Sequence, residues 1–212
     1  MNSTHPRAGL EWLDWAQQLQ AIAQNGLTFT ENPYDVERFK QILAIASEIM
    51  ASYTDADPLY VKDLFAQQTG YATPKIDTRG AIFQDGKVLL VLEREDQKWT
   101  LPGGWIDVGE SPGEAVLREI YEESGYEARI LKLAAVYDRN KHPHPPLIFH
   151  SYKLFFLCEL TGGAAKPSIE TDAVEFFPVD QLPELSLSRV VPAQILRLYE
   201  HAQHLDWPTE FD

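Results

Sequence analysis

Residues 101–128 read LPGGWIDVGESPGEAVLREIYEESGYEA, and they carry a helix signal that is bounded at both ends. Ser111 is a suitable N-cap, Pro112 fits the first helical turn, and Glu114 completes a capping box. Gly125 supplies a C-terminal stop. The stretch therefore predicts a helix of about three and a half turns with a glycine-rich loop before it.

One face of this expected helix carries Glu119, Glu122 and Glu123. Like charges at this spacing repel by a few tenths of a kcal/mol per pair, so the arrangement needs an explanation. A solvated surface would explain an isolated acidic run. A divalent cation explains it better here, because magnesium is held by a few carboxylates together with substrate phosphates. Gly103 and Gly104 also allow a backbone carbonyl to approach the same ion, since neither residue has a side chain.

The spacing of these residues resembles the Nudix box without a departure. At average amino-acid usage, an accidental match to its seven fixed positions has odds of about one in a million. The seven fixed positions are Gly104, Glu110, Arg118, Glu119, Glu122, Glu123 and Gly125, and Ile120 and Tyr126 complete the pattern.

The resemblance implies an α/β (α+β) fold, a mixed-sheet α/β/α sandwich that hydrolyses a nucleoside diphosphate linked to another group. It makes the three glutamates ligands of Mg²⁺ or Mn²⁺, with Gly103 as a carbonyl ligand. Its structural positions are Gly104, Glu110, Arg118 and Gly125. An arginine that grips a carboxylate with two hydrogen bonds would fix the loop against the helix.

The reaction also needs a base, since water must lose a proton as it attacks phosphorus. Glu123 is one candidate. Glu170 is the other, because it lies in an expected loop before a strand, where related enzymes often place such an acid. The residues leave this choice open.

Residues 10–70 predict a small helical module. Leu13, Ala16, Leu19 and Ala23 have helical spacing in the first helix, and Asn25-Gly26 is expected to stop it. A second helix starts at Asn32-Pro33, and a third starts at Asp57-Pro58 and ends near Gly70. Three short helices bury little surface alone, so we expect the module, residues 1–72, to pair with a second copy or lean on the domain at 73–212.

Strand patterns begin near residue 76. Two β-rich runs flank Asp85-Gly86, which is a strong hairpin signal. Further strands are expected in residues 128–138, 148–160 and 174–179, and a final helix in 192–204. Strands mixed with two helices predict a mixed sheet that helices flank.

The 212 residues are 44% hydrophobic, 11% aromatic and 24% charged, which is typical of a globular protein. No apolar run reaches the roughly 20 residues that span a bilayer, and no export signal is recognisable. We therefore expect a soluble, cytoplasmic protein. Its single cysteine, Cys158, lies in the apolar run LFFLCEL and is expected to be a buried small hydrophobe.

A formal net charge of −14 opposes binding to nucleic acid or anionic lipid. An anionic substrate therefore needs a metal ion or a local basic patch. Residues 137–146 supply such a patch with Arg139, Lys141, His142 and His144, although a plain surface turn has equal odds. Arg79 is a second candidate for phosphate binding. Trp105 and Tyr137 are candidates to stack on a base or cap the site, whereas large aromatics more often belong to a core.

A closer resemblance covers nearly the whole chain, through segments such as LEWLDWAQQLQAIAQ, TPKIDTR, DRNKH and IETDA. These are similar to bacterial Nudix hydrolases with a helical N-terminal domain, a group that includes CDP-choline pyrophosphatase. The resemblance implies CDP-choline as the substrate, with CMP and phosphocholine as products. ADP-ribose, which gives AMP and ribose 5-phosphate, is the alternative, and RNA ends stay open.

A nucleotide-sensing regulator that binds DNA is a hypothesis from another class. Such regulators commonly lose glutamates of the box, whereas all are present here. The first 75 residues also carry nine acids against five Lys and Arg, which is the wrong sign for a phosphate backbone. The sequence therefore favours an enzyme over a regulator. The small helical module favours a homodimer, because it buries little surface alone.

Overall fold

The computed structural model describes residues 10–54 and 56–212, which form two compact units. One unit holds the described residues up to Pro74 together with Pro146–His150. The other holds Lys75–Pro145 and Ser151–Asp212. Each unit has its own core and is described by itself.

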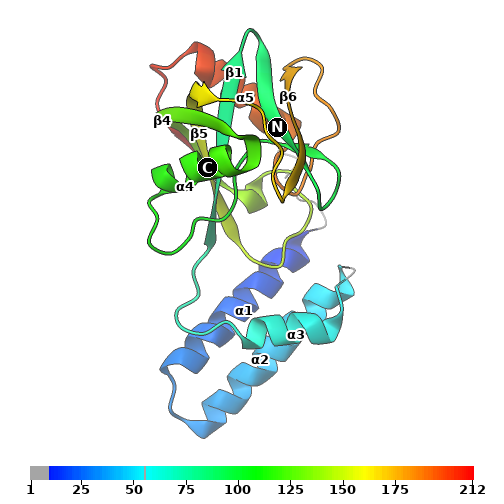
Figure 1. The fold of residues 1–212 in the computed structure, drawn as a ribbon. Coiled ribbons are helices and arrows are strands. Elements are labelled where there is room, and N and C mark those ends of the chain that lie inside the picture. Colours follow the sequence, from blue (N-terminus) through cyan, green and yellow to red (C-terminus); the bar gives the residue numbers. More distant parts are fainter. Residues whose placement is uncertain (1–9, 55) are drawn as a thin grey trace, which may run out of the picture. The chain divides into compact units, whose positions relative to one another are not determined.

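The first unit contains three helices, which Figure 1 labels α1 (Glu11–Phe29), α2 (Pro33–Ser52) and α3 (Pro58–Ala66). The Asn32 side chain accepts a hydrogen bond from the Tyr34 amide, and the Asp57 side chain caps α3 in the same way. Both starts agree with the N-cap and proline signals of the sequence. The buried core of the unit consists of Trp12, Leu13, Ala16, Ala46, Met50, Val61 and Phe65.

The predicted stop of α1 at Asn25-Gly26 is wrong, because the helix continues through Gly26 to Phe29. A Cβ atom on Gly26 would lie 2.3 Å from ring atoms of Phe39 on α2. The glycine therefore serves helix packing, since its missing side chain makes room for an aromatic ring.

The second unit is built around a seven-stranded mixed sheet in the order β3-β2-β1-β5-β4-β7, with β6 paired to β2. β1 pairs in parallel with β5, as β4 does with β7. At the turn between β1 and β2, Asp85 and Gly86 have φ angles of 50° and 73°, as the hairpin signal predicts. The strands are β1 (Lys75–Gln84), β2 (Lys87–Glu93), β3 (Trp99–Thr100), β4 (Tyr126–Asp138), β5 (Ser151–Gly163), β6 (Thr171–Pro178) and β7 (Glu210–Phe211).

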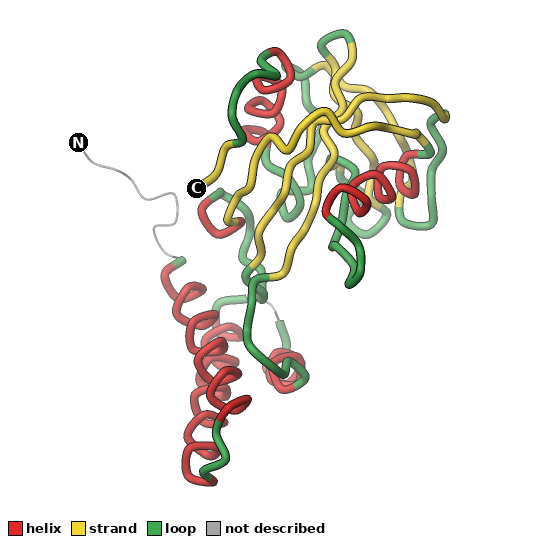
Figure 2. Tube along the Cα trace, turned by 90° about the vertical axis from the view of Figure 1, so that its left-hand side faces the viewer, coloured by secondary structure: helices red, strands yellow, loops and turns green. Residues whose placement is uncertain are grey.

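Helices α4 (Pro112–Ser124) and α5 (Pro192–Gln203) cover opposite faces of this sheet, as Figures 1 and 2 show. Neighbouring strand residues alternate between the two faces. Ala81 packs in the cluster that contains Ile195 of α5, whereas Ile82 packs in the cluster that contains Ile120 of α4. This arrangement confirms the predicted mixed α/β fold, and Cys158 is buried in the α4-side cluster as expected.

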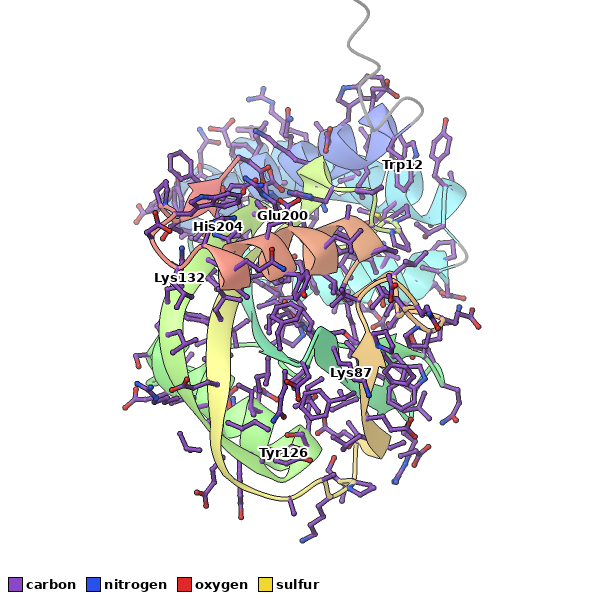
Figure 3. The ribbon with its side chains drawn as sticks, turned by 90° about the horizontal axis from the view of Figure 1, so that it is seen from above. Trp12, Lys87, Tyr126, Lys132, Glu200 and His204 are labelled. Atoms are coloured by element: carbon purple, nitrogen blue, oxygen red, sulfur yellow. The ribbon has the colours of Figure 1, made fainter. Side chains whose placement is uncertain are left out.

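In Figure 3, Tyr126 marks the place where α4 gives way to β4, and Glu200 and His204 mark the C-terminal part of α5 and its end. Lys132 of β4 contacts the ring of His201 at 3.4 Å, which ties that strand to α5. Within the described residues, no helix has the length and apolar character needed to cross a membrane.

Candidate active site

Helix α4 begins and ends at the residues that the sequence indicates. The Ser111 hydroxyl accepts a hydrogen bond from the Glu114 amide at 3.3 Å, and the Glu114 carboxylate accepts one from the Ser111 amide at 2.9 Å. Gly125 follows the helix with φ 74°, a left-handed conformation that glycine adopts without strain. These caps fix where each glutamate of the helix lies.

The glycine loop, residues 101–106, lies against β1. The amides of Thr78 and Gly80 donate to the carbonyls of Gly104 and Pro102, each at 2.8 Å. Gly103 has φ +143°, and a Cβ atom on it would lie 2.0 Å from the Thr78 carbonyl oxygen. No residue with a side chain fits this position, so the loop depends on glycine.

Gly104 faces the helix rather than the strand. A Cβ atom on Gly104 would lie 2.8 Å from Oε1 of Glu119. The absence of a side chain here leaves room for the carboxylate of Glu119 beside the loop. The two glycines therefore have different tasks, since one fits the loop to β1 and the other admits an acid from α4.

Glu123 is the most buried acid of the box, with 5% of its surface exposed. Its Oε2 accepts a hydrogen bond of 2.8 Å from the Gly103 amide. Burial raises the pKa of Glu123 to about 8, which Glu93 and Glu119 favour and which Arg79 and the Gly103 amide oppose. Burial also raises the pKa of Glu119, against the opposing charge of Arg118.

Arg118 connects the remaining acids of the box. Its Nε and Nη2 atoms donate to the two carboxylate oxygens of Glu110 at 2.7 and 2.9 Å, a bidentate pair. Its Nη1 atom donates to Glu119 at 3.0 Å and to Glu122 at 2.9 Å. These hydrogen bonds hold the pKa of Glu110 below its usual range, and the acids raise that of Arg118. One guanidinium group thus contacts three carboxylates and offsets one of their three negative charges.

The residues present fit a divalent cation by their chemistry. Glu119, Glu122 and Glu123 offer hard carboxylate oxygens, which suit Mg²⁺ or Mn²⁺. The space that a Cβ on Gly104 would fill leaves Glu119 accessible from the loop. In the described part of the chain, no three His, Cys, Asp or Glu side chains already converge as a metal site. Cation binding would therefore draw Glu119 and Glu122 away from Arg118.

Glu170, the second candidate base, is exposed directly before β6. Its backbone carbonyl accepts a hydrogen bond of 2.8 Å from the Arg94 amide. The next residue, Thr171, donates from its hydroxyl to the Glu123 carbonyl at 2.7 Å. The backbone on which Glu170 stands is thus tied to the C-terminal turn of α4.

The residues that the sequence predicts as substrate contacts fall into an exposed pair and a buried group. Trp105 lies within the glycine loop and is 47% exposed, and Lys141 is exposed as well. Tyr137 lies in the α5-side core, where its ring packs near Phe155. Arg139 is buried and donates to the Ser188 carbonyl at 3.3 Å.

The basic segment 137–146 is only partly a surface turn. His142 contacts the Asp212 carboxylate at 3.2 Å. His144 is buried between the Leu187 carbonyl and the Gln194 side chain. Arg79 is also buried, and it binds Asp77 with two hydrogen bonds of 3.2 and 2.7 Å.

Sequence reasoning missed two features. Glu93 is buried at the end of β2, where Arg189 contacts it at 3.1 Å. Burial raises the pKa of Glu93, while Arg189 and Arg79 lower it. Lys153 is buried against Asp77. Each is a charged residue within or at the end of an apolar strand run, and this signal was available in KVLLVLE and YKLFFL.

Comparison with known proteins yields matches to two family models. A model described as a NUDIX domain matches residues 74–199. A model described as a UDP-X-like, N-terminal oligomerisation domain matches residues 10–65.

Several individual proteins are also similar to this chain. "Putative ADP-ribose pyrophosphatase YjhB" of Bacillus subtilis (strain 168) is 45% identical over 202 residues, which are 95% of this chain and 97% of that protein. The crystal structure of a Streptococcus suis 89-1591 ADP-ribose pyrophosphatase is 41% identical, with a TM-score of 0.61, and covers 66% of this chain and 100% of its own. The crystal structure of a UDP-X diphosphatase is 35% identical, with a TM-score of 0.63, over 95% of this chain and 98% of its own.

Proposed function

Because this chain belongs to the Nudix family of hydrolases, we propose that it hydrolyses the diphosphate of ADP-ribose, with Mg²⁺ or Mn²⁺ as cofactor. One observation carries the proposal. Glu119 and Glu123 of α4 lie beside a loop that only glycine can build, and the loop donates its Gly103 amide to Glu123. A cation held by these carboxylates would suit a reaction at phosphorus, in which negative charge must be offset at fixed positions.

Glu119, Glu122 and Glu123, with the carbonyl of Gly103, would hold the cation. When bound, the cation would neutralise phosphate oxygens and lower the pKa of the attacking water. The chain's own residues supply the framework for this reaction. Arg118 and Glu110 fasten the segment between the glycine loop and α4 to the helix, and the Gly103 amide keeps Glu123 at the glycine loop.

Two carboxylates are candidates to take the proton of the attacking water. The raised pKa of Glu123 suits proton transfer near neutral pH. Glu170 stands at an exposed position on backbone that is tied to the same helix turn. An exposed acid remains free to approach a bound substrate, so we propose Glu170 as the base and Glu123 as a ligand.

ADP-ribose is the first candidate substrate because two relatives that are more than 40% identical carry that activity in their names. The products would be AMP and ribose 5-phosphate. CDP-choline, predicted from the whole-chain resemblance, is the second candidate, and it would give CMP and phosphocholine. The name of the relative described as a UDP-X diphosphatase adds uridine nucleotides as a third class of candidate substrate. We propose Trp105 and Lys141 as substrate contacts because both are exposed.

We propose that residues 1–72 form an oligomerisation domain and residues 73–212 the catalytic domain, and that the protein is a homodimer. The description of the N-terminal family model supports oligomerisation. Helix α1 carries Trp15, Ile22 and Phe29 at intervals of seven residues, and they are 60%, 54% and 71% exposed. Such an apolar stripe on one side of a helix suits packing against a second copy. A cytoplasmic location stays a prediction.

The test is product release from ADP-ribose, CDP-choline and a UDP-sugar at equal concentrations, with Mg²⁺ or Mn²⁺. We expect the highest kcat/KM for ADP-ribose, with AMP as the nucleotide product. A clear preference for CDP-choline would move the assignment to the second candidate and keep the chemistry. Absence of hydrolysis in all three reactions, with both metals, would contradict the proposal.

A further inference from the structure

Three charged side chains are buried together in the sheet of the second unit. Asp77, Arg79 and Lys153 are 5%, 4% and 2% exposed. Asp77 and Arg79 are two residues apart on β1, so they lie on the same face of the sheet. Lys153 on β5 is the register partner of Asp77 in the parallel pairing. Folding therefore brings two cations to one carboxylate.

The carboxylate of Asp77 binds both cations directly. Its Oδ1 atom accepts from Lys153 Nζ at 2.5 Å and from Arg79 Nε at 3.2 Å, and its Oδ2 atom accepts from Arg79 Nη2 at 2.7 Å. Burial alone would raise the pKa of Asp77, but the two cations hold it below its usual range. Burial lowers the pKa of Lys153 to about 8. Two cations therefore share a single acid away from solvent.

Stability alone does not account for such a group. Burying ions costs desolvation energy, and well-packed apolar residues are often at least as stabilising as a buried ion pair. A role in orienting other groups is a better explanation. Arg79 is the member of the group that reaches beyond it.

The guanidinium group of Arg79 is directed toward the candidate active site. Its Nη1 atom donates to the Leu101 carbonyl at 3.2 Å, at the start of the glycine loop. Burial by itself would lower the pKa of Arg79, but the charges of Asp77, Glu123 and Glu93 raise it. Arg79 thus contacts Asp77 through Nε and Nη2 and the loop through Nη1.

These contacts form a continuous path from β5 to the box. Lys153 fixes the carboxylate of Asp77, and this carboxylate fixes two of the three guanidinium nitrogens of Arg79. The third nitrogen binds the loop two residues before Gly103, whose amide binds Glu123. A shift of the lysine would therefore change where the loop presents its amide.

We infer that Lys153 is a positioning residue, which acts on the glycine loop through Asp77 and Arg79. Lys153 is 2% exposed, so we expect it to act through these contacts and not directly on the substrate. The kinetic consequence rests on the proposed hydrolysis, whereas the effect on the loop does not. A loop misplaced by about 1 Å costs on the order of 100-fold in rate.

The experiment compares Lys153→Met, Asp77→Asn and the double variant Asp77→Asn/Lys153→Met with the wild-type chain. Each is measured for kcat and KM, for thermal unfolding, and for the ¹H–¹⁵N NMR signal of the Gly103 amide. We expect Lys153→Met to lower kcat about 10- to 100-fold, with KM changed less than about threefold, and to shift the Gly103 signal.

The double variant separates positioning from stability. It removes one positive and one negative charge, so it should unfold at a higher temperature than Asp77→Asn, which leaves two buried cations without an acid. Its kcat should stay low and its Gly103 signal shifted, because Arg79 has lost its anchor. Arg129→Gln, which breaks an exposed pair with Glu159 between β4 and β5, is the control and should match the wild-type protein in kcat and in the Gly103 signal.

Recovery of both kcat and thermal stability in the double variant, with an unchanged Gly103 signal, would overturn the inference. If Lys153→Met does not fold, the double variant supplies the same comparison. If the wild-type protein hydrolyses no nucleotide, the proposed function fails separately, and the Gly103 signal alone decides whether the lysine positions the loop.

Discussion

The Gly103 amide donates a hydrogen bond of 2.8 Å to the carboxylate of Glu123, and this contact joins the glycine loop to the last turn of α4. The two residues are 20 positions apart in the sequence. The loop can present this amide because Gly103 adopts φ +143° against the backbone of β1. The contact therefore depends on a backbone conformation as much as on the acid.

Replacing Gly103 by alanine should destabilise the protein and abolish turnover. The new Cβ would lie 2.0 Å from the Thr78 carbonyl oxygen, at a φ angle that side chains rarely adopt. We expect a loss of about 2–5 kcal/mol in the free energy of unfolding, measured by urea denaturation. Gly109→Ala is the control, because Gly109 also has a positive φ, +100°, but a Cβ atom on it would meet no atom within 4 Å. It should cost about 1 kcal/mol and keep most activity; equal effects of the two changes would contradict the steric explanation.

Replacing Glu170 by glutamine should lower kcat by about 100-fold with little change in KM, because general base catalysis contributes factors of this size. The side chain is exposed, so thermal unfolding should not change. Glu175→Gln, at an exposed acid within β6, is the matched control and should be fully active. Full turnover of the Glu170 variant would leave Glu123 as the base.

Replacing Ile22 by lysine should convert the dimer to a monomer. A charge in the middle of the stripe formed by Trp15, Ile22 and Phe29 opposes burial against a second copy. Sedimentation velocity at micromolar concentration measures the change. Leu196→Lys, at an exposed position on α5, is the control and should leave the wild-type mass unchanged. A wild-type chain that sediments as a monomer would refute the proposed dimer itself.

His144 should make the protein sensitive to acid. Burial, together with the charges of Lys153, Arg139 and His142, lowers the pKa of His144 to about 3, against the hydrogen bond with the Leu187 carbonyl, which raises it. The unfolded chain takes up a proton near pH 6.5 while the folded chain does not, so stability falls as the pH drops from 6.5 toward 3. At pH 5 this linkage costs about 2 kcal/mol.

His144→Asn should be less stable than wild type at pH 7, because the ring contacts both Leu187 and Gln194. The difference in stability between the two proteins should be smaller at pH 5, because the wild-type protein loses stability through His144 and asparagine does not titrate. Thermal unfolding at both pH values measures it, with His204→Asn at an exposed position as control. An equal difference in stability at pH 7 and pH 5 would show that His144 is not the cause of the loss of stability in acid.

Local signals in the sequence predict much of this structure. The caps Ser111 and Gly125 bound α4 as expected, and Asp85-Gly86 forms the hairpin turn. These signals work because capping and turn chemistry involve residues close together in the chain. The Nudix family is confirmed by the comparisons, and the spacing of its box was visible in the sequence.

Other features depend on distant residues, which local patterns do not reveal. Gly26 stays within α1 because Phe39 of the next helix packs on it. Asp77 and Lys153 meet only through the parallel register of β1 and β5. In the same way, the sequence presents Arg79 as a candidate for phosphate binding, whereas its burial follows from the sheet that forms around it.

The most direct test of the central claim is the rate of AMP release from ADP-ribose by the wild-type protein and by Glu122→Gln, each with Mg²⁺, with Mn²⁺ and with EDTA. The Glu122 side chain is exposed and forms a salt bridge with Arg118, so its replacement should leave thermal unfolding nearly unchanged. We predict metal-dependent release by the wild-type protein and a loss of at least about 100-fold in the variant. Release that persists in EDTA, or a variant as active as wild type, would contradict the assignment of the α4 glutamates.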